Sequence, residues 1–132
     1  MHRLFRALLA FTTLMLSASS WASPAWTPYS PTVFVAAQAA GRAIVVDVAA
    51  DWCPTCRAQL PTLDELRADE NMKDVLFFRV DFDEDKHFLD AHRVRRQSTI
   101  LVFDGEKELA RSIAETDRDR LRRVVLDALA NK

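Results

Sequence analysis

The sequence predicts an α/β protein built on one mixed β-sheet, and three observations carry this prediction. The β-branched run at 44–48, interrupted by Asp47, is suited to a strand that is covered on both faces. Strand-like and helix-like stretches alternate after this run. Asp104-Gly105 is a strong turn signal between two strand-like runs, so the last two strands should form an antiparallel hairpin.

Local signals place the elements along the chain. Ser30-Pro31 supplies an N-cap and a first helical residue, and Gly41 can end that helix in the left-handed conformation. Residues 23–29 are expected to be an extended leader without a regular element. The expected elements are a helix over 30–41, a strand over 43–50, a helix over 54–68, a strand over 75–80, a helix over 83–92, strands over 99–103 and 107–114, and a C-terminal helix whose apolar face carries Leu121, Val124, Val125, Ala128 and Leu129.

The first 22 residues have the pattern of a secretory signal peptide. Arg3 and Arg6 form a basic start, an apolar stretch follows at 7–16, and small residues lead up to Ala22. Cleavage after Ala22 would leave residues 23–132 as one domain, which we expect in the periplasm. An uncleaved membrane anchor is the alternative, although the apolar stretch is short for spanning a bilayer.

Composition restricts the classes of function. Without the first 22 residues, which carry Arg3 and Arg6, the balance is 16 basic against 19 acidic residues, or −3 with histidines neutral. This charge argues against a nucleic-acid partner, because such partners require clustered positive charge. The chain has two cysteines, Cys53 and Cys56, so an exported form has no other disulfide framework. We expect a monomer whose folding depends on its hydrophobic core alone.

The two cysteines stand where the central strand gives way to a helix. Pro54 is tolerated in a first helical turn because an N–H there has no intrahelical partner. At a helix N-terminus, unpaired N–H groups and the positive end of the helix dipole favour a thiolate, which lowers a cysteine pKa below its free value of about 8.5. Cys56 is within disulfide reach of Cys53 on the same helical face. The pair therefore predicts a dithiol switch.

Two other uses of the cysteines are less favoured by the sequence than the redox role. A closed zinc site needs four ligands, and His2, His87 and His92 are not in a ligand-spaced cluster with the pair. A structural disulfide that closes so short a loop removes little entropy from the unfolded chain. The prediction is a redox-active pair and no metal.

The run VVDVAADWCPTCRAQLP, at 45–61, resembles the thioredoxin superfamily. It combines an acidic residue in the strand, Asp47, with Trp52, the cysteine pair and a helix-kinking proline, Pro61. The resemblance implies a thioredoxin fold, with a four-stranded mixed sheet in the order 2-1-3-4 flanked by helices. The first strand of the full fold would be missing.

The resemblance also implies a thiol:disulfide oxidoreductase with no cofactor beyond the Cys53–Cys56 disulfide. Pro54 and Thr55 resemble the inner dipeptide of the thioredoxin-like reductants of cytochrome c maturation. Asp47 would lie beneath Cys56 with a raised pKa and exchange a proton with that thiol. The alternative is a strand-end carboxylate satisfied by backbone or water.

The main departure from the family pattern is at Gln97, Ser98 and Thr99, where similar proteins have a cis-proline before the third strand. A cis peptide bond before serine costs about 2.5–4 kcal/mol, so we expect a trans bond. The departure leaves two further function classes open: a redox-weak binding module and a metal-binding protein of the same fold. Three arginines before this loop are expected to border the active face: Arg93, Arg95 and Arg96.

These features predict a periplasmic reductant of protein disulfides. The helix start should expose Cys53 and bury Cys56, so that Cys53 attacks and Cys56 resolves the mixed disulfide. Trp52 is expected to act as a lid over the pair. An oxidising compartment would keep the pair as a disulfide, so a membrane electron carrier is the expected donor.

Overall fold

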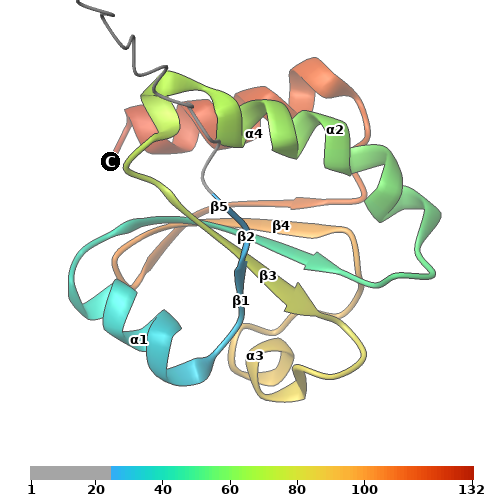
Figure 1. The fold of residues 1–132 in the computed structure, drawn as a ribbon, viewed down its shortest axis with the longest axis horizontal. Coiled ribbons are helices and arrows are strands. Elements are labelled where there is room, and N and C mark those ends of the chain that lie inside the picture. Colours follow the sequence, from blue (N-terminus) through green and yellow to red (C-terminus); the bar gives the residue numbers. More distant parts are fainter. Residues whose placement is uncertain (1–24) are drawn as a thin grey trace, which may run out of the picture.

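A five-stranded mixed sheet lies between two layers of helices in the computed structural model, which describes residues 25–132 (Figure 1). The predicted signal peptide, residues 1–22, lies outside the described residues. None of the helices within 25–132 is long and apolar enough to cross a bilayer. The elements are β1 (Thr27–Pro28), α1 (Pro31–Ala39), β2 (Ala43–Ala49), α2 (Pro54–Ala68), a 3₁₀ turn (Glu70–Met72), β3 (Leu76–Asp81), α3 (Lys86–Ala91), β4 (Thr99–Asp104), β5 (Lys107–Ile113) and α4 (Arg118–Ala130).

The strands are arranged in the order β1-β3-β2-β4-β5. β2 pairs in parallel with β3 and antiparallel with β4, and β4 and β5 form the predicted antiparallel hairpin. The four predicted strands therefore have the predicted order.

The prediction of four strands is wrong, because the sheet has a fifth, short strand, β1. This strand lies in the segment expected to be an extended leader without a regular element. β1 pairs in parallel with the outer side of β3, with Thr27 opposite Phe78, and the Tyr29 N–H donates to Arg79 O at 2.9 Å. Two residues are too few to show the alternation that reveals a strand. Pro28, which has no N–H to donate, is compatible with this edge position.

Helices cover both faces of the sheet, with α2 and α4 on one face and α1 and α3 on the other (Figure 1). Side chains of β2 alternate between the two cores: Val46 and Val48 pack on the α1 and α3 side, and Val45 packs on the α2 and α4 side. This double burial explains the apolar run at 44–48. By the same alternation, Asp47 belongs to the face covered by α2, the helix that carries the cysteines.

α3 is shorter than the predicted helix over 83–92, and the acidic residues before it form a turn. The Asp81 carboxylate accepts hydrogen bonds from the N–H groups of Asp83 and Glu84, at 2.7 and 3.1 Å. The Asp85 carboxylate accepts one from the Asp81 N–H at 2.7 Å. Carboxylates that bond nearby N–H groups compete with helix formation, which is why the helix begins only at Lys86.

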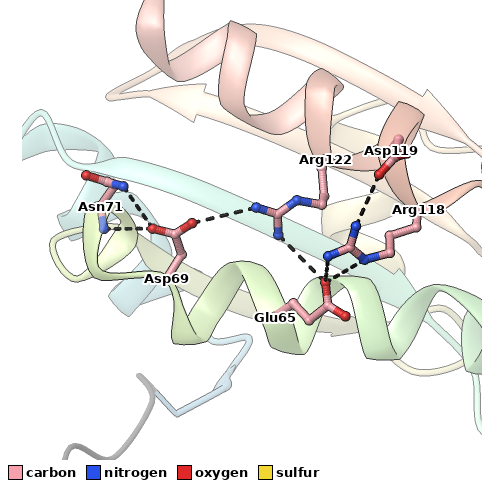
Figure 2. Close-up of polar contacts among 6 residues, drawn as sticks. All are labelled: Glu65, Asp69, Asn71, Arg118, Asp119 and Arg122. Carbon is pink, nitrogen blue, oxygen red and sulfur yellow. Dashed lines mark hydrogen bonds and ion pairs between the residues drawn. The ribbon is translucent and has the colours of Figure 1, made fainter.

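Polar contacts link α2 and the turn that follows it to α4 (Figure 2). Glu65 Oε2 lies 2.8 Å from Arg118 Nη2 and 3.8 Å from Arg122 Nη1. Arg122 Nη2 also lies 3.7 Å from Asp69 Oδ2, and Asp69 Oδ1 accepts two hydrogen bonds from Asn71. Such partly exposed ion pairs contribute little stability each. The apolar core beneath α2 is therefore its main attachment to the sheet.

Candidate active site: a dithiol at the start of helix α2

The cysteine pair lies where β2 leads into α2. A turn after β2 makes Cys53 the N-cap residue of α2, and the Cys53 N–H donates to Ala50 O at 3.1 Å. Pro54 takes the first helical position. Cys53 and Cys56 form a disulfide, with their Cα atoms 5.3 Å apart. The predicted position of the pair at a helix start is confirmed.

Burial of the two sulfur-bearing residues differs from the prediction. Cys53 is 1% exposed and Cys56 is 4% exposed, so the expectation that the helix start exposes Cys53 and buries Cys56 is wrong for the disulfide form. Both cysteines belong to a buried cluster with Ala49 and Ala50, and Phe82 packs against this cluster. The helix end still distinguishes the two, because Cys53 Sγ accepts a hydrogen bond from the Cys56 N–H at 3.1 Å. This contact favours charge on Cys53.

Ser98 closes the other side of the disulfide. Its Oγ lies 3.3 Å from Cys53 Sγ and 3.4 Å from Cys56 Sγ, and the residue is fully buried. The peptide bonds of the described residues are all trans, as predicted for the bond before Ser98, and Ser98 has a φ of 61°. Its N–H donates to Val48 O, and its carbonyl accepts from the Ala114 N–H, both at 2.9 Å. Ser98, at the position where the resemblance implies a proline, thus makes polar contacts in three directions.

Asp47 is buried beside one cation. Its Oδ2 lies 3.3 Å from Arg79 Nη1, and its Oδ1 has no hydrogen-bond partner among the described residues. Burial raises the pKa of Asp47 to about 6, against the lowering effect of Arg79, and the Asp64 carboxylate adds a smaller upward effect. No hydrogen bond joins Asp47 to a cysteine in the part of the chain described. Proton exchange with Cys56 therefore requires a bridging water or a shift of side chains.

Comparison with known proteins gives the family. Residues 30–127 match the family described as Thioredoxin. The chain belongs to the thioredoxin family. It is 27% identical to a thioredoxin H-type of Fagopyrum esculentum over 95 residues, 72% of this chain and 80% of the relative. Among solved structures, Trxlp from Edwardsiella tarda EIB202 is 40% identical with a TM-score of 0.70, over 74% of this chain and 96% of that one.

The fold agreement extends to more distant thioredoxins. The thioredoxin of Trypanosoma brucei brucei superposes with a TM-score of 0.71 at 20% identity, over 84% of this chain and 96% of that one. At that identity the likeness shows the fold alone. Family membership together with the Cys53–Cys56 pair makes this protein a thioredoxin-like thiol–disulfide oxidoreductase.

Thioredoxins carry electrons on the cysteine pair itself and need no cofactor. Within residues 25–132, no group of three or more His, Cys, Asp and Glu side chains is placed to hold a metal. His87 is exposed, and the His92 ring packs against Phe88 with centroids 4.3 Å apart. Burial lowers the pKa of His92, which favours the neutral ring. His92 thus packs against the core and His87 lies at the surface, and neither histidine bonds a sulfur among the described residues.

Residues at the start of α2 form the outer border of the thioredoxin site. Trp52 is 56% exposed, and its indole N–H donates to Asp83 Oδ2 at 2.7 Å. This bond ties the tryptophan to the acidic turn before α3, and its role as a lid stays a prediction. Pro54 is exposed and Thr55 is half-buried. Neither carries a charge.

The arginines before Ser98 lie near the site in sequence but do not contact the sulfurs. The side chains of Arg93, Arg95 and Arg96 are exposed. The hydrogen-bond partners of the two sulfurs among the described residues are the Ser98 hydroxyl and the Cys56 N–H. Gln97 is half-buried, and the buried Thr99 donates from Oγ1 to Arg96 O at 2.8 Å, which fixes the start of β4. The hydrogen-bond partners of the sulfurs are therefore uncharged.

Gln59 is a site residue that sequence reasoning missed. It is fully buried on α2, one turn after Cys56, and its Nε2 donates to Ser98 O at 3.3 Å and to Glu115 O at 2.9 Å. Its Oε1 has no partner among the residues described. The available signal was a long polar side chain in the apolar stripe of α2. A buried amide in that stripe needs partners, and the partners are the backbone carbonyls of Ser98, beside the disulfide, and of Glu115.

Proposed function

We propose that this thioredoxin-family protein is an exported, periplasmic reductant of disulfides in partner proteins. The cysteine pair at the start of α2 supplies the chemistry. The basic and then apolar pattern of residues 1–22 supports export. The Pro54-Thr55 dipeptide resembles that of the reductants of cytochrome c maturation. The proposed substrate is therefore an oxidised cysteine pair of another exported protein, and the proposed source of electrons is a membrane electron carrier.

The uncharged hydrogen-bond partners of the two sulfurs carry the proposal of a reducing direction. A cation beside Cys53 would stabilise the thiolate and so favour the reduced form, which is the property of a strong oxidant. The sulfurs here are bonded by a hydroxyl and a backbone N–H instead. The carboxylate of Asp47 is buried under the same helix. Less stabilisation of the thiolate means that the protein gives up electrons more readily.

The reaction uses the two cysteines in sequence. The Cys53 thiolate attacks one sulfur of the partner disulfide, forms a mixed disulfide and releases the partner's other sulfur as a thiolate. Cys56 then loses its proton and attacks Cys53 Sγ, which closes the Cys53–Cys56 disulfide and releases the second partner thiolate. The partner gains two electrons and two protons. The protein gives up two electrons and two protons. The Cys53 proton leaves when the attacking thiolate forms, and Asp47 is proposed to accept the Cys56 proton and pass it on to water or to the departing partner thiolate.

Reduction of insulin by the reduced, mature protein tests the activity, with precipitation of the freed insulin chain as the readout. The expected result is turnover by the parent protein and none by Cys53→Ser or Cys56→Ser. The N-terminal residue of protein recovered from the periplasm of a Gram-negative host tests export. Ser23 is the expected start, and an unprocessed chain held in the membrane would support the anchor instead.

A redox-weak binding module is the second candidate, because both sulfur-bearing residues are at least 96% buried in the disulfide form. Such a module would bind a partner without exchanging electrons. It predicts no insulin reduction by the parent protein, whereas the reductant predicts turnover that depends on both cysteines.

A further inference from the structure

We propose that the Ser98 hydroxyl is a catalytic hydrogen-bond donor that stabilises the cysteine thiolate during disulfide exchange. This inference rests on the proposed function, because it assigns Ser98 a step in that same reaction. A proline at this position would offer neither a hydroxyl nor an N–H. Ser98 supplies both, and the two groups have different tasks.

The hydroxyl is placed between the two sulfurs. Ser98 Oγ lies 3.3 Å from Cys53 Sγ and 3.4 Å from Cys56 Sγ. Neither sulfur of a disulfide carries hydrogen, so the hydroxyl is the donor in these contacts. Ser98 is fully buried, so water does not compete for its proton. One donor therefore faces both atoms that gain or lose charge in the reaction.

The backbone holds the hydroxyl in this position. Ser98 has a φ of 61°, a left-handed conformation that is unfavourable for residues other than glycine. It is retained because three hydrogen bonds fix the residue: its N–H to Val48 O, its carbonyl from the Ala114 N–H, and the same carbonyl from Gln59 Nε2. A donor fixed before charge develops needs no reorganisation when the thiolate forms.

The donor acts on whichever sulfur is negative. When the reduced protein attacks a partner disulfide, the hydroxyl and the Cys56 N–H both donate to the Cys53 thiolate. In the reverse direction a partner thiolate attacks Cys53 Sγ, the Cys53–Cys56 bond breaks, and Cys56 leaves as a thiolate within reach of the same hydroxyl. Ser98 keeps its own proton throughout, so the electron and proton balance of the exchange is unchanged.

Hydrogen bonds to charged acceptors are about twice as strong as those to neutral ones. The hydroxyl should therefore stabilise the thiolate more than the disulfide. It should lower the Cys53 pKa and make the protein somewhat less reducing than it would be with an apolar residue at this position.

Two substitutions separate the hydroxyl from the backbone. Ser98→Ala removes the hydroxyl and keeps a Cβ in the left-handed conformation, whereas Ser98→Gly removes the hydroxyl and relieves that strain. Ser112→Ala is the matched control, since Ser112 is a buried serine on β5. The Cys53 pKa is measured from the pH dependence of iodoacetamide alkylation of the reduced protein. The equilibrium with glutathione is measured in parallel.

Both Ser98 variants should raise the Cys53 pKa by about one unit, a tenfold change in thiolate formation. Both should shift the glutathione equilibrium toward the disulfide by up to about tenfold, which is about 30 mV. Ser112→Ala should match the parent protein. Urea denaturation checks that each variant is folded under the conditions of the assay.

An unchanged Cys53 pKa in both folded Ser98 variants overturns the proposal. A rise in Ser98→Ala that Ser98→Gly reverses also overturns it, because the effect would then belong to backbone strain. Neither readout uses a partner protein. Failure of the parent protein to reduce insulin would therefore count against the proposed function, while the thiolate measurements would still decide the role of Ser98.

Discussion

Two loops meet at the disulfide, and they position it by different means. The loop at 50–53 uses backbone geometry: it ends in the N-cap of α2, and the helix N-terminus faces Cys53. The loop at 95–98 uses a side chain and a strained backbone, with the Ser98 hydroxyl against both sulfurs and a left-handed φ. The first loop follows the family pattern and the second departs from it. A thioredoxin site thus keeps its dithiol geometry while the facing loop changes its chemistry.

Substitutions that introduce or remove proline should have very different effects on stability in the two loops, and the effect at Ser98 is the largest expected. Ser98→Pro removes the N–H that donates to Val48 O and forces φ from 61° toward about −65°, so it should cost about 3 kcal/mol or more of unfolding free energy. Pro54 occupies a position with no N–H requirement. Pro54→Ala should therefore change stability by about 1 kcal/mol or less. Urea denaturation measures both, and a Ser98→Pro protein as stable as the parent would contradict the account of the second loop.

Asp47, on the strand that leads into the first loop, should make stability depend on pH. Its pKa in the folded protein is about 6, above the ordinary value of 3.8, so the folded state binds more protons between these values and stability falls as pH rises through them. The fall should be about 2 to 3 kcal/mol. Asp47→Asn should remove this pH dependence, and above pH 6 its free energy of unfolding should exceed that of the parent protein. The control variant Asp90→Asn, at an exposed position on α3, should show the same pH dependence of stability as the parent protein.

A second readout of Asp47→Asn concerns the reaction. If Asp47 accepts the Cys56 proton, the variant should slow decay of the mixed disulfide more than its formation, because only the resolving step uses that proton. Stopped-flow kinetics separates the two steps. Equal rates of decay in variant and parent would return Asp47 to a structural role.

The helix end should make Cys53 the more reactive thiol of the reduced protein. Two donors, the Cys56 N–H and the Ser98 hydroxyl, are within reach of Cys53 Sγ. With a limiting amount of iodoacetamide, Cys53 should be alkylated several-fold faster than Cys56, as read by mass spectrometry of peptides. The two cysteines are similarly buried, so a difference in burial cannot explain a difference in reactivity. Preferential labelling of Cys56 would therefore show that the N-terminus of α2 does not determine which thiol is more reactive.

The predictable parts of this molecule are those with a local chemical signal. The apolar run of β2, the Asp104-Gly105 turn and proline at the start of α2 each act within a few residues, and the structure has the elements they predict. β1 was missed because its two residues gain their order from β3, far along the chain. The acidic run before α3 was misassigned because its carboxylates bond the turn rather than the helix start.

The site residues also fall into two groups: those that local signals predict and those that depend on contacts between distant segments. The positions of Cys53 and Cys56 and the trans bond before Ser98 follow from local rules. Burial of Cys53 and the contact of Ser98 with both sulfurs depend on how two distant loops pack, which the sequence does not display. Gln59 belongs to this second class, since its partners lie in loops 39 and 56 residues away.

The reduction potential of the Cys53–Cys56 pair tests the central proposal most directly, namely that the uncharged hydrogen-bond partners of the sulfurs favour a reducing direction. Equilibration of the mature protein with glutathione buffers, followed by thiol quantification, gives the value. A potential nearer the thioredoxin value of about −270 mV than the strong-oxidant value of about −120 mV is the predicted result. A potential above about −180 mV would contradict the claim and would point to the side chains of Arg93, Arg95 and Arg96 as the source of thiolate stabilisation.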